Sequence, residues 1–340
     1  MYKERIDLDV GTMQELFGVN DQNVKKLENE LGVSLLTREG MVELSGEDVA
    51  AVKTAVETLR TLNRMGEQGE TLGEFAVDRA LDFVRTGSSD AAVEAMRDTI
   101  AVSYNGAPIK CRTVGQKKYV EALRNNTVTI SIGPAGTGKT YLAVAVAVAA
   151  LKAKKVAKIV LCRPAVEAGE KLGFLPGDLQ NKVDPYLRPL YDALEELLGR
   201  DTMGRYLETG VIEIAPLAYM RGRTLKNSFV IADECQNMML SSHIMILTRL
   251  GEGSKMVLTG DITQIDLPDP RDSGLRECAE ILSGMDDIAV IRLSGGDVIR
   301  HKLVAQIVKA FEQHAAARKS TAPSKKPTHP ALYTRHAKGK

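Results

Sequence analysis

Two groups of residues in this 340-residue chain have the types and spacing that phosphate chemistry needs. The first group is a glycine-rich turn that fits the pattern G-x-x-x-x-G-K-[ST]. Glycine permits positive backbone φ angles, so that successive N–H groups can face an anion, and the start of a following helix adds partial positive charge. The turn consists of Gly133, Pro134, Ala135, Gly136, Thr137, Gly138, Lys139 and Thr140. This pattern predicts a loop that binds the phosphates of a nucleotide.

The sequence around the loop supports this interpretation. A β-branched run, TVTISI, precedes the loop, and an Ala/Val-rich stretch follows it, which predicts a buried strand leading into a buried helix. In such a loop Lys139 can reach the β- and γ-phosphates, and the Thr140 hydroxyl can ligate Mg²⁺. ATP and Mg²⁺ are therefore the expected ligands.

The second group consists of polar residues at the ends of two later apolar strands. Asp233 and Glu234 end the run NSFVIADE; Asp233 is expected to hold Mg²⁺, and Glu234 to orient and polarise an attacking water. A kinase does not need the second carboxylate, so the pair favours hydrolysis. Gln264 follows the strand that ends in Gly260-Asp261, where a neutral amide can distinguish ATP from ADP.

The elements that must position these residues alternate along residues 111–314. Strand-like runs alternate there with helical ones, which is typical of an α/β fold with a parallel sheet. Residues 1–63 show the order β-α-α-β-β-α and predict a small α+β domain. Residues 64–110 are expected to be a helical connector. Residues 315–340 are expected to be a disordered basic tail, because Arg318–Lys340 contains seven Lys/Arg and no acidic residue. Such a tail either solubilises the chain or contacts nucleic acid.

Composition narrows the class of protein. Apolar residues make up 44% and charged residues 26%, with a formal net charge of +1, as in an ordinary water-soluble protein. We expect no signal peptide and no membrane partner, since charged residues interrupt the first residues and the Ala-rich stretch is too short to span a bilayer. Four scattered cysteines without a CxxC pair favour a cytoplasmic location.

The motifs together resemble those of known families. The series G-x-x-x-x-G-K-T, D-E-x-Q and T-G-D-x-x-Q resembles the core of superfamily 1 helicases, a RecA-like P-loop NTPase fold. The segments CRPAVEAGEKLGFLPGDLQNKVDPYLRPLYDAL, LTRLGEGSKMVLTGDITQIDLP and GGDVIRHKLVAQIV resemble the PhoH family of ATPases. This resemblance covers roughly residues 101–311, and the chain is similar to shorter PhoH proteins, without a PIN nuclease domain.

The resemblance implies further roles. Gln116 lies where helicase-like proteins place an adenine-reading glutamine, and Arg163 begins a segment that in helicases faces nucleic acid or couples it to the nucleotide site. Arg249, Arg292 and Arg300 are the candidates for an arginine finger, and each could equally be a surface arginine. Because the chain has one motor-like core, the resemblance points to a homo-oligomeric ring with a finger supplied by a neighbour.

The N-terminal region resembles a KH-type RNA-binding domain, which clamps a nucleic-acid backbone with a GXXG loop. The corresponding loop here is Gly18-Val19-Asn20-Asp21. Its last position departs from the pattern, because the charge of Asp21 would repel a phosphate. The alternative is a KH-shaped module for packing or assembly.

The sequence thus predicts a cytoplasmic, Mg²⁺-dependent ATPase of the PhoH type that remodels or unwinds RNA, in RNA metabolism or ribosomal RNA maturation. Family associations add a ribosome-maturation endoribonuclease as a partner. Two alternatives remain at this point. One is a P-loop kinase for a small molecule, and the other is a nucleotide-gated RNA-binding or scaffold protein.

Overall fold

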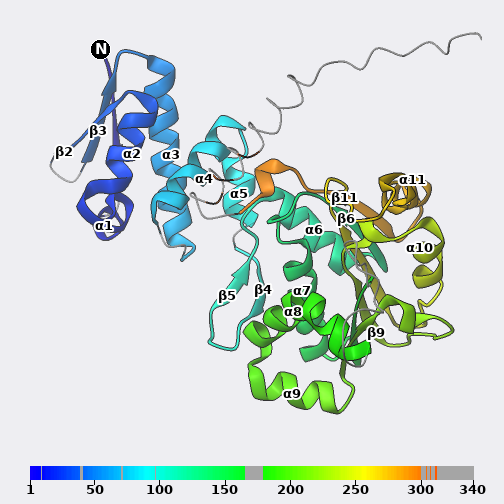
Figure 1. Cartoon of the computed structure of the whole chain (residues 1–340). Coiled ribbons are helices and arrows are strands. Elements are labelled where there is room, and N and C mark those ends of the chain that lie inside the picture. Colours follow the sequence, from blue (N-terminus) through cyan, green and yellow to red (C-terminus); the bar gives the residue numbers. More distant parts are fainter. Residues whose placement is uncertain are drawn as a thin grey trace, which may run out of the picture. The chain divides into compact units, whose positions relative to one another are not determined.

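The centre of the fold is a six-stranded sheet, of which Figure 1 labels β6, β9 and β11. The order of its strands is β11-β6-β10-β9-β7-β8. The computed structural model describes residues 1–8, 10–38, 41–69, 72–95, 97–164 and 179–299, together with the single residues Val304, Ile307 and Phe311. Every pairing within the sheet is parallel. Its strands are β6 Val128–Ile132, β7 Lys158–Arg163, β8 Ile212–Pro216, β9 Ser228–Ala232, β10 Lys255–Gly260 and β11 Ile288–Arg292. The predicted α/β fold with a parallel P-loop sheet is confirmed.

Helices cover both faces of this sheet, which explains why its central strands are apolar on both sides. One face packs against α6 and α7, in a cluster that includes Phe229 and Ile231. The other face packs against α10 and α11, in a cluster that includes Val230 and Leu258. The helices of this region are α6 Val114–Asn125, α7 Lys139–Lys152, α8 Leu179–Leu198, α9 Arg200–Glu208, α10 Leu240–Leu247 and α11 Leu275–Leu282.

The order of strands brings the loops of interest to one edge of the sheet. Strand β6 ends at the glycine-rich loop, and its neighbour β10 ends at Gly260. Strand β9 lies next to β10 and ends immediately before Asp233, and β7 lies on the far side of β9 and ends at Arg163. Because all four strands are parallel, their carboxyl ends meet at the same edge, where ligands of open α/β sheets bind.

The N-terminal region has the predicted order of elements. They are β1 Tyr2–Asp7, α1 Val10–Phe17, α2 Gln22–Leu31, β2 Ser34–Arg38, β3 Met41–Gly46 and α3 Val49–Glu67. The strands form an antiparallel sheet in the order β1-β3-β2. Between α1 and α2, Asn20 and Asp21 have φ angles of 55° and 58°, in the left-handed region. The element order is confirmed, and the KH-type identity and RNA contact of this region stay predictions.

The predicted connector contains more than helices. Helix α4 spans Glu74–Arg85 and α5 spans Ser89–Ala95, and residues of both lie in the same apolar cluster as α3. A hairpin then follows, with β4 Thr99–Val102 paired to β5 Pro108–Lys110. The hairpin was not expected, although Asn105-Gly106 between two apolar runs is a recognised hairpin signal.

The described residues up to Ile299 form one compact unit. The predicted basic tail, residues 315–340, and the candidate finger Arg300 lie outside the described residues. Among the residues that the structure describes, none of the helices combines the length and the apolar character that crossing a membrane requires.

Candidate functional site

The glycine-rich loop, residues 133–140, joins the buried strand β6 to helix α7. Gly136 and Gly138 have φ angles of 87° and 80°, a conformation that favours glycine. Gly138 is also the N-cap of α7, so the first N–H groups of the helix open toward the loop. Gly133 has no room for a side chain, because a Cβ there would lie 2.7 Å from the Cβ of Leu293. The motif therefore has glycine where the backbone requires it.

Lys139 holds its ammonium group over this loop. The Nζ atom donates to the carbonyl of Gly133 at 2.6 Å and to that of Pro134 at 2.9 Å. The residue is 9% exposed, so the charge is close to the loop rather than dispersed in solvent. Hydrogen bonds to neutral carbonyls are readily exchanged for stronger, charge-assisted bonds to a phosphate. The arrangement suits the phosphate-binding role expected for this lysine.

Thr140 and Asp233, the two predicted Mg²⁺ ligands, are brought into direct contact. The Thr140 hydroxyl donates to Oδ1 of Asp233 at 2.7 Å, and the Thr259 hydroxyl donates to the same oxygen at 2.6 Å. Asp233 is 4% exposed. Mg²⁺ in proteins takes one or two carboxylates together with substrate phosphates and water. A hydroxyl and a carboxylate beside a phosphate-binding loop fit that ligand set.

Glu234 lies beside Asp233 in a left-handed conformation, with a φ of 55°. Its carboxylate is paired with Arg163, and the same guanidinium lies 3.5 Å from Oδ2 of Asp233. A single arginine at the end of β7 therefore lies within ion-pair distance of both carboxylates. The sequence had indicated Arg163 as a coupling residue, but its contact with the two acids was not foreseen.

Gln236 was missed as a functional candidate, although it is the last residue of the D-E-x-Q motif. It is completely buried. Its Nε2 donates to the Glu234 carboxylate and, at 3.0 Å, to the carbonyl of Gln264, and its Oε1 accepts from the N–H of Asp261 at 3.0 Å. One amide thus joins the carboxylate pair to the loop that follows β10.

Gln264 lies in that loop and lines the same cleft as Lys139 and Glu234. The loop is held by Asp261, whose Oδ1 accepts from the N–H of Thr263 at 2.9 Å and whose Oδ2 accepts from the N–H of Ala135 at 3.0 Å. The second of these bonds ties the loop to the glycine-rich segment. A change at the phosphates can therefore reach Gln264 through direct contacts.

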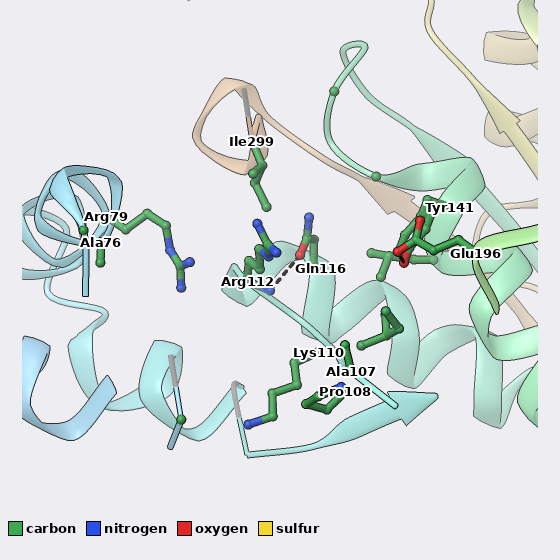
Figure 2. A pocket seen from close by; sticks show the side chains of 16 residues that line it. Ala76, Arg79, Ala107, Pro108, Lys110, Arg112, Gln116, Tyr141, Glu196 and Ile299 are labelled. Carbon is green, nitrogen blue, oxygen red and sulfur yellow. Dashed lines mark hydrogen bonds between the residues drawn. The ribbon is translucent and has the colours of Figure 1, made fainter. Parts of the chain in front are cut away.

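Two clefts meet at the glycine-rich loop. The first, of 540 Å³, contains Lys139, Thr140 and both carboxylates. The second, of 690 Å³, is lined by Gln116 and several basic side chains and is shown in Figure 2. Both clefts are lined by Gly136, Gly138, Tyr141 and Glu196, and the Tyr141 hydroxyl donates to Glu196 at 2.8 Å. Burial, followed by this bond to Glu196, raises the pKa of Tyr141, which keeps the hydroxyl protonated.

Gln116 lines the second cleft, but both ends of its amide already hold backbone groups. Its Oε1 accepts from the N–H of Arg112 at 2.8 Å, and its Nε2 donates to the carbonyl of Thr137 at 3.1 Å. An amide has a second hydrogen and a second lone pair, so each end keeps one further hydrogen-bonding position. Gln116, the predicted adenine-binding residue, thus also stabilises the phosphate-binding loop.

Three basic side chains in the second cleft were missed by the sequence reasoning. Figure 2 shows Arg79 extending from α4 into the hollow, with Lys110 and Arg112 nearby. The Lys110 ammonium donates to the carbonyl of Gln68 at 2.6 Å. Arg79 comes from the predicted connector, to which no chemistry had been assigned, and no local motif marks it.

The candidate arginine fingers differ in their surroundings. The guanidinium of Arg249 donates to the carbonyls of Met245 and Arg223, each at 3.1 Å, and so supports the local backbone. Arg292 is exposed at the carboxyl end of β11, next to the strand that leads into the phosphate-binding loop. Arg300 lies outside the described residues. Of the two arginines that the structure describes, Arg292 is the more exposed.

A glycine-rich loop between a buried parallel strand and a helix, with a Thr–Asp pair at its mouth, defines a P-loop nucleotide-binding protein. The family model for PhoH-like protein matches residues 108–312. The chain belongs to the PhoH family and is an ATP-binding protein.

Known relatives are similar over most of their length. The PhoH-like protein of Bacillus subtilis (strain 168) is 48% identical over 298 residues, which cover 88% of this chain and 93% of the relative. That of Mycobacterium tuberculosis (strain ATCC 25618 / H37Rv) is 46% identical, with coverages of 92% and 88%. Protein PhoH of Escherichia coli (strain K12) is 38% identical, with coverages of 78% and 73%. A solved structure, the Sulfolobus solfataricus SWI2/SNF2 ATPase core in complex with dsDNA, is 15% identical, has a TM-score of 0.33, and is matched over 62% of this chain and 54% of its own.

Proposed function

We propose that this chain hydrolyses ATP in the presence of Mg²⁺. The observation that carries the proposal is the arrangement of Lys139, the Thr140–Asp233 pair and Glu234 around one cleft at the carboxyl edge of the sheet. Lys139 binds the triphosphate, and the Thr140–Asp233 pair binds its metal. Glu234 supplies a base beside the place where the terminal phosphate would lie.

The two clefts divide the nucleotide between them. The triphosphate occupies the 540 Å³ cleft, where the N–H groups of the loop and the Lys139 ammonium bind its charge. The adenosine half occupies the 690 Å³ cleft, with Tyr141 at the junction and Gln116 available for the base. The basic residues Arg79 and Arg112 give that cleft cationic groups that can stack on an adenine ring.

Thr140 and Asp233 would hold the magnesium ion. When bound, the ion neutralises charge on the β- and γ-phosphates. The role of the protein here is to fix a hydroxyl oxygen and a carboxylate oxygen in one place. Thr259 supports this, because its hydroxyl also bonds Oδ1 of Asp233 and fixes the orientation of the carboxylate.

Glu234 orients the attacking water. The water oxygen forms a bond to the γ-phosphorus, the bond to the bridging oxygen of ADP breaks, and the water proton passes to the carboxylate or to the released phosphate. An ionised carboxylate has about four acceptor positions, so Glu234 can bind this water while it keeps its contacts with Arg163 and Gln236.

RNA is the proposed partner for the work that hydrolysis drives. The motif series that resembles superfamily 1 helicases and the unopposed charge of Arg318–Lys340 support RNA remodelling or unwinding. The single motor-like core supports a homo-oligomeric ring in which a neighbour supplies an arginine finger. A cytoplasmic location, a role in ribosomal RNA maturation and an endoribonuclease partner complete the proposal and rest on the family resemblance.

The test is a measurement of phosphate release from ATP with Mg²⁺, with and without a single-stranded RNA oligonucleotide, alongside the mass of the assembly. Release without any other acceptor supports the ATPase and excludes the small-molecule kinase. ATP binding with negligible release, even with RNA and the assembled oligomer present, favours the nucleotide-gated binding protein instead. Absence of ATP binding refutes the proposal.

A further inference from the structure

The segment Ser294–Ile299, which follows β11, runs along the phosphate-binding loop, and we term it the strap. Immediately before it, the N–H of Leu293 donates to the carbonyl of Ile132, the last residue of β6, at 2.8 Å. At its other end the N–H of Ile299 donates to the carbonyl of Gly136, within the loop, at 2.9 Å. The strap is therefore attached to the beginning and the middle of the loop segment.

Asp297 fixes the middle of the strap to the start of α6. It is 8% exposed. Its Oδ1 accepts from the Thr113 hydroxyl at 2.6 Å, and its Oδ2 accepts from the N–H of Ser294 at 2.8 Å and from the Ser294 hydroxyl at 3.1 Å. The fit is close, because a Cβ added at Gly115 would collide with this carboxylate. A buried carboxylate with three donors around it is a specific joint between segments far apart in the chain.

Thr113 passes this connection to the loop. It is the N-cap of α6, and its hydroxyl oxygen accepts from the N–H of Gln116 at 3.0 Å. The Gln116 side chain in turn donates to the carbonyl of Thr137. Asp297 is thus linked to two adjacent carbonyls of the loop. The strap leads to Ile299, which bonds the carbonyl of Gly136, and Thr113 leads to Gln116, which bonds the carbonyl of Thr137. Together these contacts form one hydrogen-bonded ring.

The direction of these two carbonyls matters for anion binding. A nest of N–H groups can face a phosphate when the intervening carbonyls do not. An arrangement fixed before the ligand arrives gives tighter binding, because less ordering accompanies association. The hydrogen-bonded ring fixes the direction of these two carbonyls without contacting the site of hydrolysis.

We infer that Asp297 is a positioning residue that keeps the phosphate-binding loop in its anion-binding conformation, acting through Thr113 and Gln116 on one side and Ile299 on the other. The inference rests on the proposed function, because it takes a nucleotide as the ligand. The expected effect of Asp297 is on the affinity of the protein for nucleotide. ATP and ADP are expected to be affected alike, since the loop binds phosphates that both share.

The test compares three variants of the full chain. Thr113→Val removes the hydroxyl at nearly constant shape, and Thr113→Ser keeps it. Asp297→Asn replaces one acceptor oxygen by an NH2 group, so the side chain can no longer accept from both Thr113 and Ser294. Equilibrium binding of ATP and ADP with Mg²⁺, steady-state ATPase and thermal unfolding without nucleotide are measured on each. We expect Kd and KM to rise roughly tenfold or more in Thr113→Val and Asp297→Asn, as for a lost charge-assisted hydrogen bond. We expect kcat within about twofold of the parent, and near-parental binding in Thr113→Ser.

A second pair of variants keeps the test decisive if Thr113→Val or Asp297→Asn fails to fold. Ile299→Pro removes the N–H that holds Gly136, and the backbone of Val298, with φ −74° and ψ 121°, suits a residue that precedes proline. Ile299→Ala removes the side chain and keeps the N–H. Weaker nucleotide binding in Ile299→Pro than in Ile299→Ala supports the inference.

Three outcomes would overturn it. Parental Kd values in folded Thr113→Val, Asp297→Asn and Ile299→Pro would do so. So would lower thermal stability with fewer active molecules but unchanged Kd, which indicates a structural role alone. Failure of the parent itself to bind ATP refutes the proposed function and this inference together, whereas a parent that binds while the variants are unaffected refutes this inference alone.

Discussion

Replacing Glu234 by glutamine separates catalysis from binding at the proposed site. The substitution keeps the shape and the contact with Gln236 but removes the base. We expect kcat to fall by about 10²- to 10⁴-fold, the scale of a positioned acid–base group, which corresponds to about 2.7–5.4 kcal/mol. ATP affinity is expected to stay the same or to tighten, because a negative charge near the γ-phosphate is lost while the contacts of the Lys139 ammonium with the loop are unchanged.

The cost in stability is expected to be small by comparison. The substitution weakens the pair with Arg163, whose guanidinium still lies 3.5 Å from Oδ2 of Asp233. The side chain of Glu234 is 35% exposed, so water screens the pair and its loss costs about 1 kcal/mol or less. A folded variant with strongly reduced turnover is therefore the expected product.

Glu213 offers a matched control. It also pairs with an arginine, Arg223, at 2.5 and 2.8 Å, but it lies on the edge strand β8, away from both clefts. Glu213→Gln should cost at least as much stability and leave kcat unchanged. The assay is single-turnover phosphate release beside equilibrium ATP binding. Loss of affinity and rate together in Glu234→Gln, or equal loss of rate in the two variants, would refute the catalytic assignment.

Other perturbations test the remaining parts of the proposal. Lys139→Ala should weaken ATP binding and abolish hydrolysis, and parental turnover would contradict the P-loop assignment. Deletion of Arg318–Lys340 should weaken RNA binding and lower its salt dependence at constant basal ATPase, so an unchanged salt slope would contradict an RNA contact there. Mixing Lys139→Ala with Arg292→Ala subunits should restore activity if Arg292 acts on a neighbour's site, and proven mixed oligomers without recovery would exclude it. Burial lowers the pKa of His243, whose Nε2 has no hydrogen-bond partner among the described residues. Stability should therefore fall as the pH drops below about 6.5, where the unfolded chain binds the proton first. Urea unfolding at pH 7.5 and 5.5 checks this, and an identical pH dependence in His243→Leu would contradict it.

The parts of the fold and site that sequence reasoning could predict are those encoded locally. The loop of residues 133–140 needs glycine at fixed spacing, whatever surrounds it, and the structure has positive φ angles at Gly136 and Gly138. The contact between Thr140 and Asp233 follows once β6, which leads into the loop, and β9, which ends before Asp233, are placed in one parallel sheet. The β-α-α-β-β-α order was likewise visible in the apolar periodicity.

Contacts across the sheet could not be predicted in this way. Arg163 reaches both carboxylates because β7 lies beside β9, and the order of parallel strands is set by packing rather than by any local pattern. Gln236 is within a motif that the sequence displays, yet its role depends on where its amide points, toward Gln264 and Asp261. The bond between Thr113 and Asp297 joins residues 184 positions apart.

Gln116 shows how the two kinds of information combine. The resemblance to helicase-like proteins implied a contact with adenine, and Gln116 does line the cleft proposed for adenosine. The structure adds that its amide also fixes the carbonyl of Thr137, so a base bound there and the phosphates bound by the loop would act on the same side chain. The N–H of Gln116 bonds to the Thr113 hydroxyl, which in turn bonds to Asp297. Recognition of the base and the shape of the phosphate-binding loop are therefore expected to change together. A variant such as Gln116→Ala should therefore weaken binding of inorganic triphosphate as well as of ATP, whereas a residue that reads adenine alone would leave triphosphate binding unchanged.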